Sequence, residues 1–259
     1  MQGVDWDLDF LERVWRYRHP GRDPETFRED FCSTAALATT WVRRGPRRRA
    51  WGVDHDPEPL AWARAHRLPW AREAASRVTL VRGDVRSARR PAVDVACALN
   101  FSWWVFHERG DLLRYLRAAR AGLKPDGILV LNLFGGSKAE RALVERTRKR
   151  AENGPDGEML PPFTYVWEHQ SFDPIRRRLV AHIHFELGGG RRMRRAFSYD
   201  WRMYTLPELA DALGEAGFRH HEVWSEGWDR HANHGNGTLY KRAQLENQET
   251  WIAYVVATR

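Results

Sequence analysis

The sequence predicts an α/β fold: a doubly wound, mostly parallel sheet interrupted by an antiparallel β insertion. Strand-like and helical patterns alternate over the first half of the 259 residues, which favours a parallel sheet with helices on both faces. Three consecutive strand-like segments joined by short turns follow, which is typical of an antiparallel meander. We therefore expect a single domain over residues 1–259, with the insertion at about 155–205.

The first elements are marked by apolar spacing and by proline. Pro20 ends an amphipathic helix, and Pro57 opens a later one, because the first helical turn tolerates proline. AWGVD is short and apolar, as in a buried strand. In chain order the expected elements are a helix over 7–17, a strand over 27–31, a helix over 34–43, a strand over 50–54 and a helix over 57–66.

The next elements continue the alternation. VDVACAL is almost entirely apolar, as expected for a strand covered on both faces. Leu112, Leu113 and Leu116 share one side of a helix. The expected elements are strands over 77–82 and 93–99, a helix over 111–123 and a strand over 128–134.

The pattern changes after residue 134. Asp173-Pro174 and the glycines at 188–190 separate strand-like segments. Thr205 is a favourable N-cap for a helix that ends near Gly217. We expect insertion strands over 163–171, 179–187 and 193–199, then this helix, then a closing antiparallel pair over 221–224 and 251–257.

Composition limits the function classes. Hydrophobic residues make up 42% of the chain, enough for a large core, so global disorder is excluded. No apolar run approaches the roughly 20 residues that span a bilayer, so no membrane partner is expected. Cys32 and Cys97 cannot form a disulfide framework. A cytoplasmic protein is the expectation.

The net charge is +8, and nearly all of it comes from arginine. Such a charge permits a nucleic-acid partner. The arginines are scattered, however, so a small-molecule partner is favoured over nucleic acid. HANHGNG at 231–237 lacks an acid at ligand spacing, and no metal site is expected. The sequence does not specify the oligomeric state.

Polar residues follow each of the first four strands. In an open parallel sheet, ligands bind beyond the carboxyl ends of the strands. Asp54 follows the second strand, Asp84 the third and Asn100 the fourth, so acidic or amide groups line one edge. A carboxylate at the second strand can accept both hydroxyls of a ribose, and a small-residue turn after the first lets backbone approach a ligand closely.

This arrangement resembles the class I S-adenosylmethionine (SAM)-dependent methyltransferase family, whose Rossmann-like fold has a seven-stranded sheet. EDFCSTA at 29–35 is similar to the family's cofactor loop, D-x-G-C-G-x-G. GVDHDPEPL at 52–60 resembles its ribose segment and GDV at 83–85 its adenine segment. LNF at 99–101 and LKPDGILVLNLF at 123–134 are similar to later family segments. The resemblance implies SAM as the cofactor.

The cofactor loop departs from the family pattern. Phe31, Ser33 and Ala35 stand where the family has glycine. Ser33 and Ala35 suffice if their φ angles stay negative, whereas Phe31 requires a rearranged backbone or a side chain that points away from the ligand. A nicotinamide cofactor is disfavoured because no G-x-G-x-x-G follows the first strand. The resemblance and position together give these cofactor-binding candidates: Tyr17, Arg28, Glu29, Phe31, Cys32, Ser33, Thr34, Ala35, Asp54, His55, Asp84, Val85, Asn100 and Phe101.

Arg28, next to the loop, is expected to pair with the methionine carboxylate, and Tyr17 to cover the cofactor. The insertion resembles the substrate sheet of small-molecule N-methyltransferases, through FSYDWRMYTLPEL. Substrate-binding candidates are Trp103, Trp104, Phe106, Trp201 and Arg202, with Arg202 holding an acceptor carboxylate.

Methyl transfer is a direct in-line displacement, for which the protein supplies alignment and, for some acceptors, a base. His107 and Tyr199 are the catalytic candidates, and His184 is a weaker one. The expected function is methylation of a small-molecule nitrogen or oxygen. A nucleic-acid or protein methyltransferase, or a non-catalytic SAM-binding protein, remains the alternative.

Overall fold

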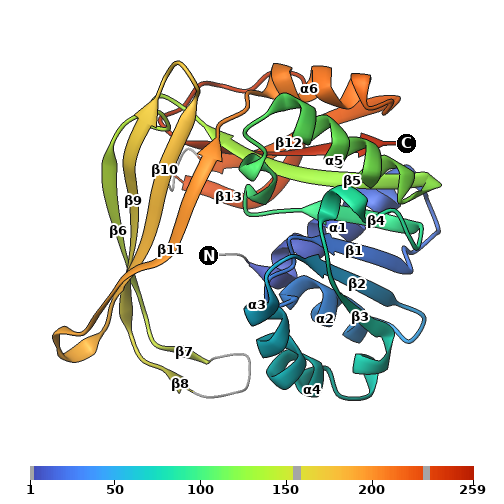
Figure 1. The fold of residues 1–259 in the computed structure, drawn as a ribbon, viewed down its shortest axis with the longest axis horizontal. Helices are drawn as coiled ribbons and strands as arrows, with labels where there is room; N and C mark the ends of the chain where they lie inside the picture. Colours follow the sequence, from blue (N-terminus) through green and yellow to red (C-terminus); the bar gives the residue numbers. More distant parts are fainter. Residues whose placement is uncertain (1–2, 154–158, 230–233) are drawn as a thin grey trace.

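The computed structural model describes residues 3–153, 159–229 and 234–259. The described residues form two larger sheets and one short two-stranded sheet, and Figure 1 shows the two larger sheets side by side. The larger sheet has eight strands in the order β13-β12-β14-β5-β4-β1-β2-β3. Its parallel strands are β1 Thr26–Asp30, β2 Arg49–Asp54, β3 Val78–Arg82, β4 Val93–Ala98 and β5 Leu123–Gly135. Its antiparallel strands are β12 His220–Asp229, β13 His234–Arg242 and β14 Trp251–Thr258.

Helices cover both faces of the large sheet and divide the core into two apolar clusters. One face carries α1 Val4–Arg18, α2 Ala36–Arg43 and α3 Pro57–Trp62, and the other carries α5 Arg109–Ala121 and α6 Leu206–Glu215. Shorter helical segments are α4 Leu68–Ala71, η1 Ala63–Arg67, η2 Arg72–Arg77, η3 Val85–Ser87 and η4 Ser102–Val105. The predicted doubly wound α/β fold is confirmed.

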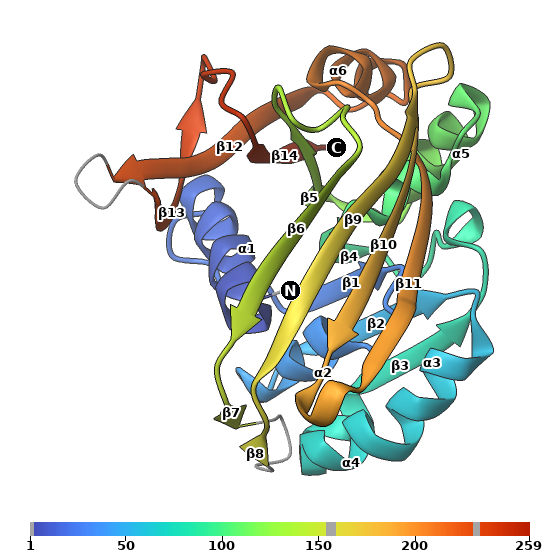
Figure 2. The same ribbon diagram turned by 90° about the vertical axis from the view of Figure 1, so that its left-hand side faces the viewer.

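The second sheet is the predicted antiparallel insertion, in the order β11-β10-β9-β6. Its strands are β6 Leu143–Lys149, β9 Phe163–Asp173, β10 Arg178–Glu186 and β11 Arg192–Arg202, with η5 Gly188–Gly190 between the last two. The two short strands β7 Glu152–Asn153 and β8 Met159–Leu160 pair beyond it. Figure 2 shows this sheet in front of the strands of the large sheet.

Two strands differ from the sequence prediction. The large sheet has eight strands instead of seven because β13 adds an edge strand next to β12. The insertion begins at β6, earlier than the expected residue 155. Both strands lack a strong apolar pattern: β6 reads LVERTRK and β13 reads HGNGTLYKR. Among the described residues, no helix is long and apolar enough to cross a membrane.

Candidate functional site at the carboxyl edge of the parallel strands

Asp54 ties together the turns that follow the first three strands. The Ser33 backbone N–H donates a 2.7 Å hydrogen bond to Asp54 Oδ2, which links the loop after β1 to the end of β2. The Gly83 N–H donates to the Asp54 carbonyl at 2.8 Å, which links β3 to the same point. Asp54 Oδ1 accepts from the Asp56 N–H at 3.0 Å. The carboxylate is therefore held in one orientation, and each oxygen keeps a lone pair for a further donor such as a ribose hydroxyl.

The loop after β1 adopts the backbone of a glycine-rich loop without any glycine. Phe31, Ser33 and Ala35 have φ angles of 59°, 48° and 56°, in the left-handed region. The condition under which Ser33 and Ala35 replace glycine without strain, a negative φ, is therefore not met. Asn100 and Phe101, after β4, are also left-handed. Each such residue costs roughly 1–2 kcal/mol, so strain is concentrated where a ligand would meet the backbone.

The Phe31 side chain points into the core. Its ring centroid lies 5.8 Å from that of Phe106 and 5.9 Å from that of Tyr115 on α5. Of the two explanations that the sequence leaves open, this placement favours a side chain turned away from the edge. Cys32 is also buried, with its Sγ packed toward Gly52 on β2, so this loop offers a ligand mainly backbone.

The Glu29 carboxyl group stabilises the first turn of α2. Its Oε2 accepts a hydrogen bond from the Ala38 N–H at 2.8 Å. The carboxyl is buried, and desolvation raises its pKa to about 8 despite this hydrogen bond. Glu29 thus organises the helix that follows the loop.

Asp84 and His55 lie at the outer part of the edge. Asp84 caps η3 through the Arg86 N–H at 2.8 Å and forms an ion pair with the Arg86 guanidinium at 2.7 Å. Hydrogen bonding to Arg86 holds the pKa of Asp84 below its usual value. Arg86 also reaches Asp111 on α5 at 2.7 Å. The His55 side chain is 83% exposed, and Val85 is buried beside Asp84.

Two predicted cofactor contacts are wrong. Arg28 is 1% exposed, and its guanidinium binds the buried carboxylate of Asp30 with both Nε and Nη2. It cannot reach a methionine carboxylate from there. Tyr17 lies in the last turn of α1, where its ring contacts Trp224 on β12. The opposite end of α1 is the one that approaches the carboxyl edge, through Trp6 and Asp7.

Asn132, on β5, fixes the turn after β4, and the sequence analysis missed it. Its Oδ1 accepts from the Phe101 N–H at 3.0 Å, and its carbonyl accepts from Trp103 Nε1 at 2.7 Å. Trp103 and Trp104 are fully buried, and Phe106 is nearly so. Trp104 packs 5.7 Å from Phe101, and the other two side chains pack on further rings of the core. Their burial leaves no surface for the predicted contact with the acceptor, which is therefore wrong.

His107 and Arg202 join the turn after β4 to β11. His107 Nε2 lies 2.8 Å from the Asp200 carbonyl, and Arg202 Nη1 donates to the His107 carbonyl at 2.9 Å. Both residues line a hollow with Arg176, away from Phe101 and Asn132. The roles of His107 as a base and Arg202 as a carboxylate clamp therefore stay predictions, for an acceptor bound in this hollow.

The two remaining base candidates, Tyr199 and His184, are both in contact with neighbouring side chains. Burial raises the pKa of Tyr199 to about 12, so its phenol keeps its proton at neutral pH and is a poor base. Its ring stacks on Trp201 at 4.3 Å, and both rings contact Trp167. His184 Nε2 lies 2.8 Å from Glu168 Oε2, and its Nδ1 accepts from the Arg195 N–H.

A cavity of about 810 Å³ opens beside Asn100 and Phe101. We call it the polar cavity. The start of α1, the ends of β5, β12 and β14, and the segment between β13 and β14 surround it. Asp7, deep in this wall, accepts a 3.0 Å hydrogen bond from the Tyr254 hydroxyl. The charged and amide side chains that line it are Asp7, Asn100, Asn132, Glu226, Arg242, Gln244, Glu246 and Gln248.

A second cavity, of about 230 Å³, lies between the large sheet and the second sheet. We call it the aromatic cavity because Phe101, Phe134, Tyr165 and Trp167 line it. His169 also faces it. The sequence analysis missed both cavities, because their walls come from segments far apart in the chain. Within the described residues, no group of three or more His, Cys, Asp or Glu side chains is placed to hold a metal; residues 231–233 of the histidine segment lie outside them.

Comparison with known proteins agrees with this geometry. The family model described as "Methyltransferase domain" matches residues 30–131, which span β1 to β5. No curated protein sequence matches the chain significantly.

Solved structures share the fold over nearly the whole chain. The SAM-bound amino pentose methyltransferase CalS10 of Micromonospora echinaspora is 22% identical, with a TM-score of 0.67, covering 100% of this chain and 92% of that one. The sugar N-methyltransferase KedS8 of a Streptoalloteichus species is 18% identical, with a TM-score of 0.62 and coverage of 100% and 88%. DesVI of Streptomyces venezuelae is 16% identical, with a TM-score of 0.67 and coverage of 97% and 92%. Residues 30–131 therefore carry a methyltransferase domain, and the chain has the fold of SAM-dependent methyltransferases over nearly its whole length.

Proposed function

We propose that this enzyme methylates an amino group of a small, hydrophilic molecule. The observation that carries the proposal is the polar cavity beside Asn100 and Phe101. Its volume of about 810 Å³ lies within the range of small-molecule sites. Three carboxylates and one guanidinium line it, so its charge favours a molecule that carries an ammonium group.

The proposed cofactor roles follow the carboxyl edge. The Asp54 carboxylate, oriented by Ser33 and Asp56, would accept the two ribose hydroxyls. Asp84 would accept from the adenine amino group, with Val85 and Phe101 as apolar walls. This placement would direct the sulfonium end toward Asn100 and Phe101, where the polar cavity begins.

The chemistry is then a single displacement. SAM supplies an electrophilic methyl group on a sulfonium ion. The acceptor ammonium would first release a proton to solvent. The free amine lone pair would then form the new C–N bond while the C–S bond breaks, so that the positive charge passes to the methylated nitrogen and neutral S-adenosylhomocysteine leaves. The residues around Asn132 and Tyr254 hold the walls in place and limit access of water, so that the protein contributes alignment more than acid–base chemistry. The amino pentose and sugar N-methyltransferases with this fold support an amine as the acceptor.

The test has two stages. Calorimetry with SAM comes first, and no binding at millimolar SAM contradicts the assignment of the edge. Formation of S-adenosylhomocysteine is then measured with ethanolamine and glucosamine, each beside its alcohol counterpart, ethylene glycol or glucose. We expect product only with the amines. Product from the alcohols alone refutes the choice of nitrogen, and SAM binding without product from any compound favours the non-catalytic alternative.

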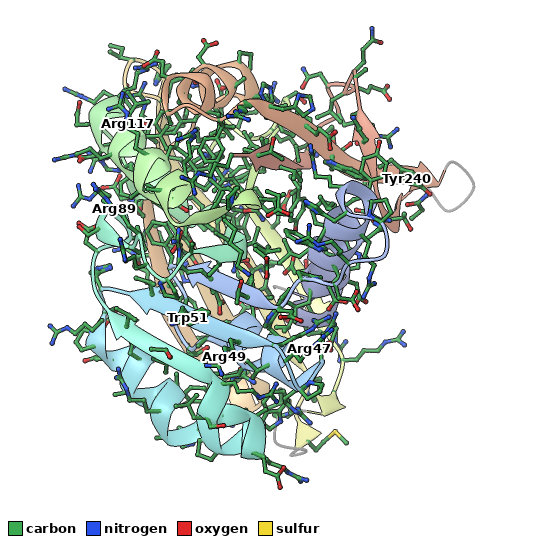
Figure 3. The ribbon with its side chains drawn as sticks, turned by 90° about the vertical axis from the view of Figure 1, so that its right-hand side faces the viewer. Arg47, Arg49, Trp51, Arg89, Arg117 and Tyr240 are labelled. Carbon is green, nitrogen blue, oxygen red and sulfur yellow. The ribbon has the colours of Figure 1, made fainter. Side chains whose placement is uncertain are left out.

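A nucleic-acid acceptor has weaker support. Phosphate recognition requires a basic groove, whereas Arg242 is the one cation among the polar-cavity residues named above. Arginines elsewhere are dispersed: Figure 3, which views the molecule from the side away from the second sheet, shows Arg47, Arg49, Arg89 and Arg117 spread over that face. Many are paired, as Arg44 is with Asp5, Asp9 and Glu12.

A further inference from the structure

The aromatic cavity has the size and lining of a site for one ring. Its volume of about 230 Å³ exceeds the roughly 150 Å³ of an apolar cavity that takes up benzene. Its walls are braced by further rings: Phe134 lies 4.8 Å from Phe101 and 4.8 Å from Trp104. Trp167 is held in the same way by Tyr199 at 5.9 Å and Trp201 at 6.2 Å. Such a rigid apolar space favours a flat ring over a flexible chain.

His169 is the buried polar residue of this site; the other polar residues that line it, Lys138, Glu145, Thr147 and Thr250, are partly or fully exposed. The His169 side chain is 4% exposed and faces the cavity, with its ring stacked 5.9 Å from that of Phe134. Within the described part of the chain, neither ring nitrogen has a hydrogen-bond partner. The Arg141 backbone is close enough to raise the pKa of His169 but does not meet hydrogen-bond geometry.

Another buried histidine of the same sheet shows what is unusual about His169. His182 lies 2.9 Å from Ser198 Oγ and 2.6 Å from Gln170 Oε1, so both of its nitrogens are bonded. Buried polar atoms are normally satisfied in this way. The two unused nitrogens of His169 therefore point to a ligand group that would bond them.

The protonation state of His169 determines which ligand group can hydrogen-bond to its ring nitrogens. Burial lowers the pKa of His169 below its ordinary value, so the ring is neutral at physiological pH. A neutral imidazole presents one N–H donor and one acceptor nitrogen. A hydroxyl group, which both donates and accepts, matches either nitrogen, whereas a carboxylate or an ammonium group matches one.

The two cavities adjoin each other. Phe101, Thr250 and Ile252 line both of them. Phe101 is also the residue next to which the reacting methyl group is placed above. An acceptor held at this point therefore lies next to both cavities.

We propose that the aromatic cavity binds a six-membered ring that carries a hydroxyl group, attached to the amine that is methylated, with His169 hydrogen-bonded to the hydroxyl. This inference rests on the proposed function and specifies the acceptor class: a hydroxylated ring compound with an amino group. A phenol and a sugar share this chemistry, and the experiment separates them.

Four amines form a matched series for kinetics with the full-length enzyme and SAM: ethylamine, 2-phenylethylamine, tyramine and 2-aminoethyl β-D-glucopyranoside. We expect kcat/KM to rise about tenfold from ethylamine to 2-phenylethylamine, through burial of the ring. A further rise of about fivefold is expected for tyramine, through the hydroxyl. A larger rise for the glucopyranoside than for tyramine identifies the ring as a sugar. Equal values for ethylamine and all three ring compounds overturn the proposal.

Three variants test which residues cause the preference for a ring and the gain from the hydroxyl. Trp167→Leu should remove most of the preference for a ring. His169→Phe should keep the ring preference, lose the gain from the hydroxyl, and raise or preserve the melting temperature, because it removes unsatisfied buried nitrogens. His182→Gln is the matched control, since His182 is equally buried with its nitrogens already bonded; it should retain both preferences. A hydroxyl gain that persists in His169→Phe contradicts the role of His169.

A binding measurement separates failure of this proposal from failure of the proposed function. Phenol, 2-aminoethyl β-D-glucopyranoside and ethylamine are titrated separately into protein loaded with S-adenosylhomocysteine, and the imidazole resonances of His169, assigned with His169→Phe, are followed by NMR. We expect phenol to shift them and ethylamine to leave them unchanged. Shifts with phenol but no turnover of any amine refute methyl transfer to nitrogen and keep the ring site. No shift with either phenol or the glucopyranoside overturns the ring site, whatever the turnover.

Discussion

The Asp54 carboxylate accepts the hydrogen bond from the Ser33 N–H, and we propose that it also binds the cofactor ribose. Asp54→Ala should weaken SAM binding about 10- to 100-fold, because hydrogen bonds to a charged group are lost and the loop after β1 loses its anchor. Isothermal calorimetry measures this. Asp56→Ala, which removes only the N-cap of α3, is the control and should leave SAM affinity within about twofold. Unchanged affinity in Asp54→Ala refutes the ribose assignment.

Ser33 has a left-handed backbone conformation, which is strained for serine but not for glycine. Its φ of 48° on an exposed position suggests that Ser33→Gly raises the free energy of unfolding by up to about 1 kcal/mol, after the larger chain entropy of glycine is subtracted. Urea denaturation measures the change. Ser76→Gly, at an exposed position inside η2, should instead lower stability by about 0.5–1 kcal/mol. A similar loss in both variants would contradict stored strain at Ser33.

Glu29 should make stability depend on pH. Its pKa is near 8 in the folded state, above the value of 4.5 for the unconstrained group, so the folded state retains a proton that the unfolded state releases. This contribution is fully present below pH 4.5 and is lost as pH rises through about 8, with a slope of at most about 1.4 kcal/mol per pH unit. Glu29→Gln, which stays neutral, should flatten the slope of unfolding free energy against pH. Identical slopes in the two proteins would disprove this.

The positions of single residues are predictable from the sequence where the residues lie at the end of a strand. Asp54 and Asp84 lie after β2 and β3 as expected, because strand ends in a parallel sheet share one edge. The role expected for Arg28 was wrong although its partner Asp30 lies two residues along the same strand, because Tyr115, which helps to bury the pair, is 85 residues from Asp30 in the chain. Asp7 and His169 were missed because their surroundings are assembled from segments more than a hundred residues apart.

At the scale of elements, local signals were reliable where local chemistry decides the structure. Thr205 and Glu208 form the capping box of α6, with a 2.7 Å bond from the Thr205 N–H to Glu208 Oε2. β6 and β13 were missed because pairing to β9 and β12, rather than an apolar pattern of their own, makes them strands.

The capping box gives a prediction for α6. Thr205→Ala should lower the free energy of unfolding by about 1 kcal/mol, because the Glu208 N–H at the start of the helix loses its acceptor. Urea denaturation measures it. Glu208→Gln preserves the box chemistry and should change stability by only a few tenths of a kcal/mol. An equal loss in both variants would show that the Arg202–Glu208 contact, rather than the cap, stabilises this region.

At the scale of the whole molecule, the alternation of strands and helices was sufficient to predict the fold, because each βαβ unit is a local pattern repeated along the chain. The position of the second sheet against the carboxyl edge was not predictable in this way. It depends on contacts such as that of Phe101 with Trp201, 6.0 Å apart and a hundred residues distant in sequence.

The net charge of +8 should have little consequence for nucleic-acid binding. Since arginines are dispersed and often paired, we expect RNA affinity weaker than about 10 μM at 150 mM salt. Fluorescence anisotropy with a labelled 20-nucleotide RNA at 50 and 200 mM salt measures it. Saturable, strongly salt-dependent binding below that concentration would favour a nucleic-acid acceptor.

Arg177 joins the two places where the chain passes between the sheets. Its Nε donates to the Met203 carbonyl at 3.0 Å, after β11, and its Nη2 contacts Glu140 at 2.7 Å, before β6. The segment from Glu140 to Met203 therefore starts and ends at residues that bind the Arg177 side chain. Residues 140–203 can therefore be treated as a transplantable cassette: exchanged as a unit between enzymes of this fold, with both junctions kept, it would carry one wall of the acceptor site while the cofactor half stayed intact.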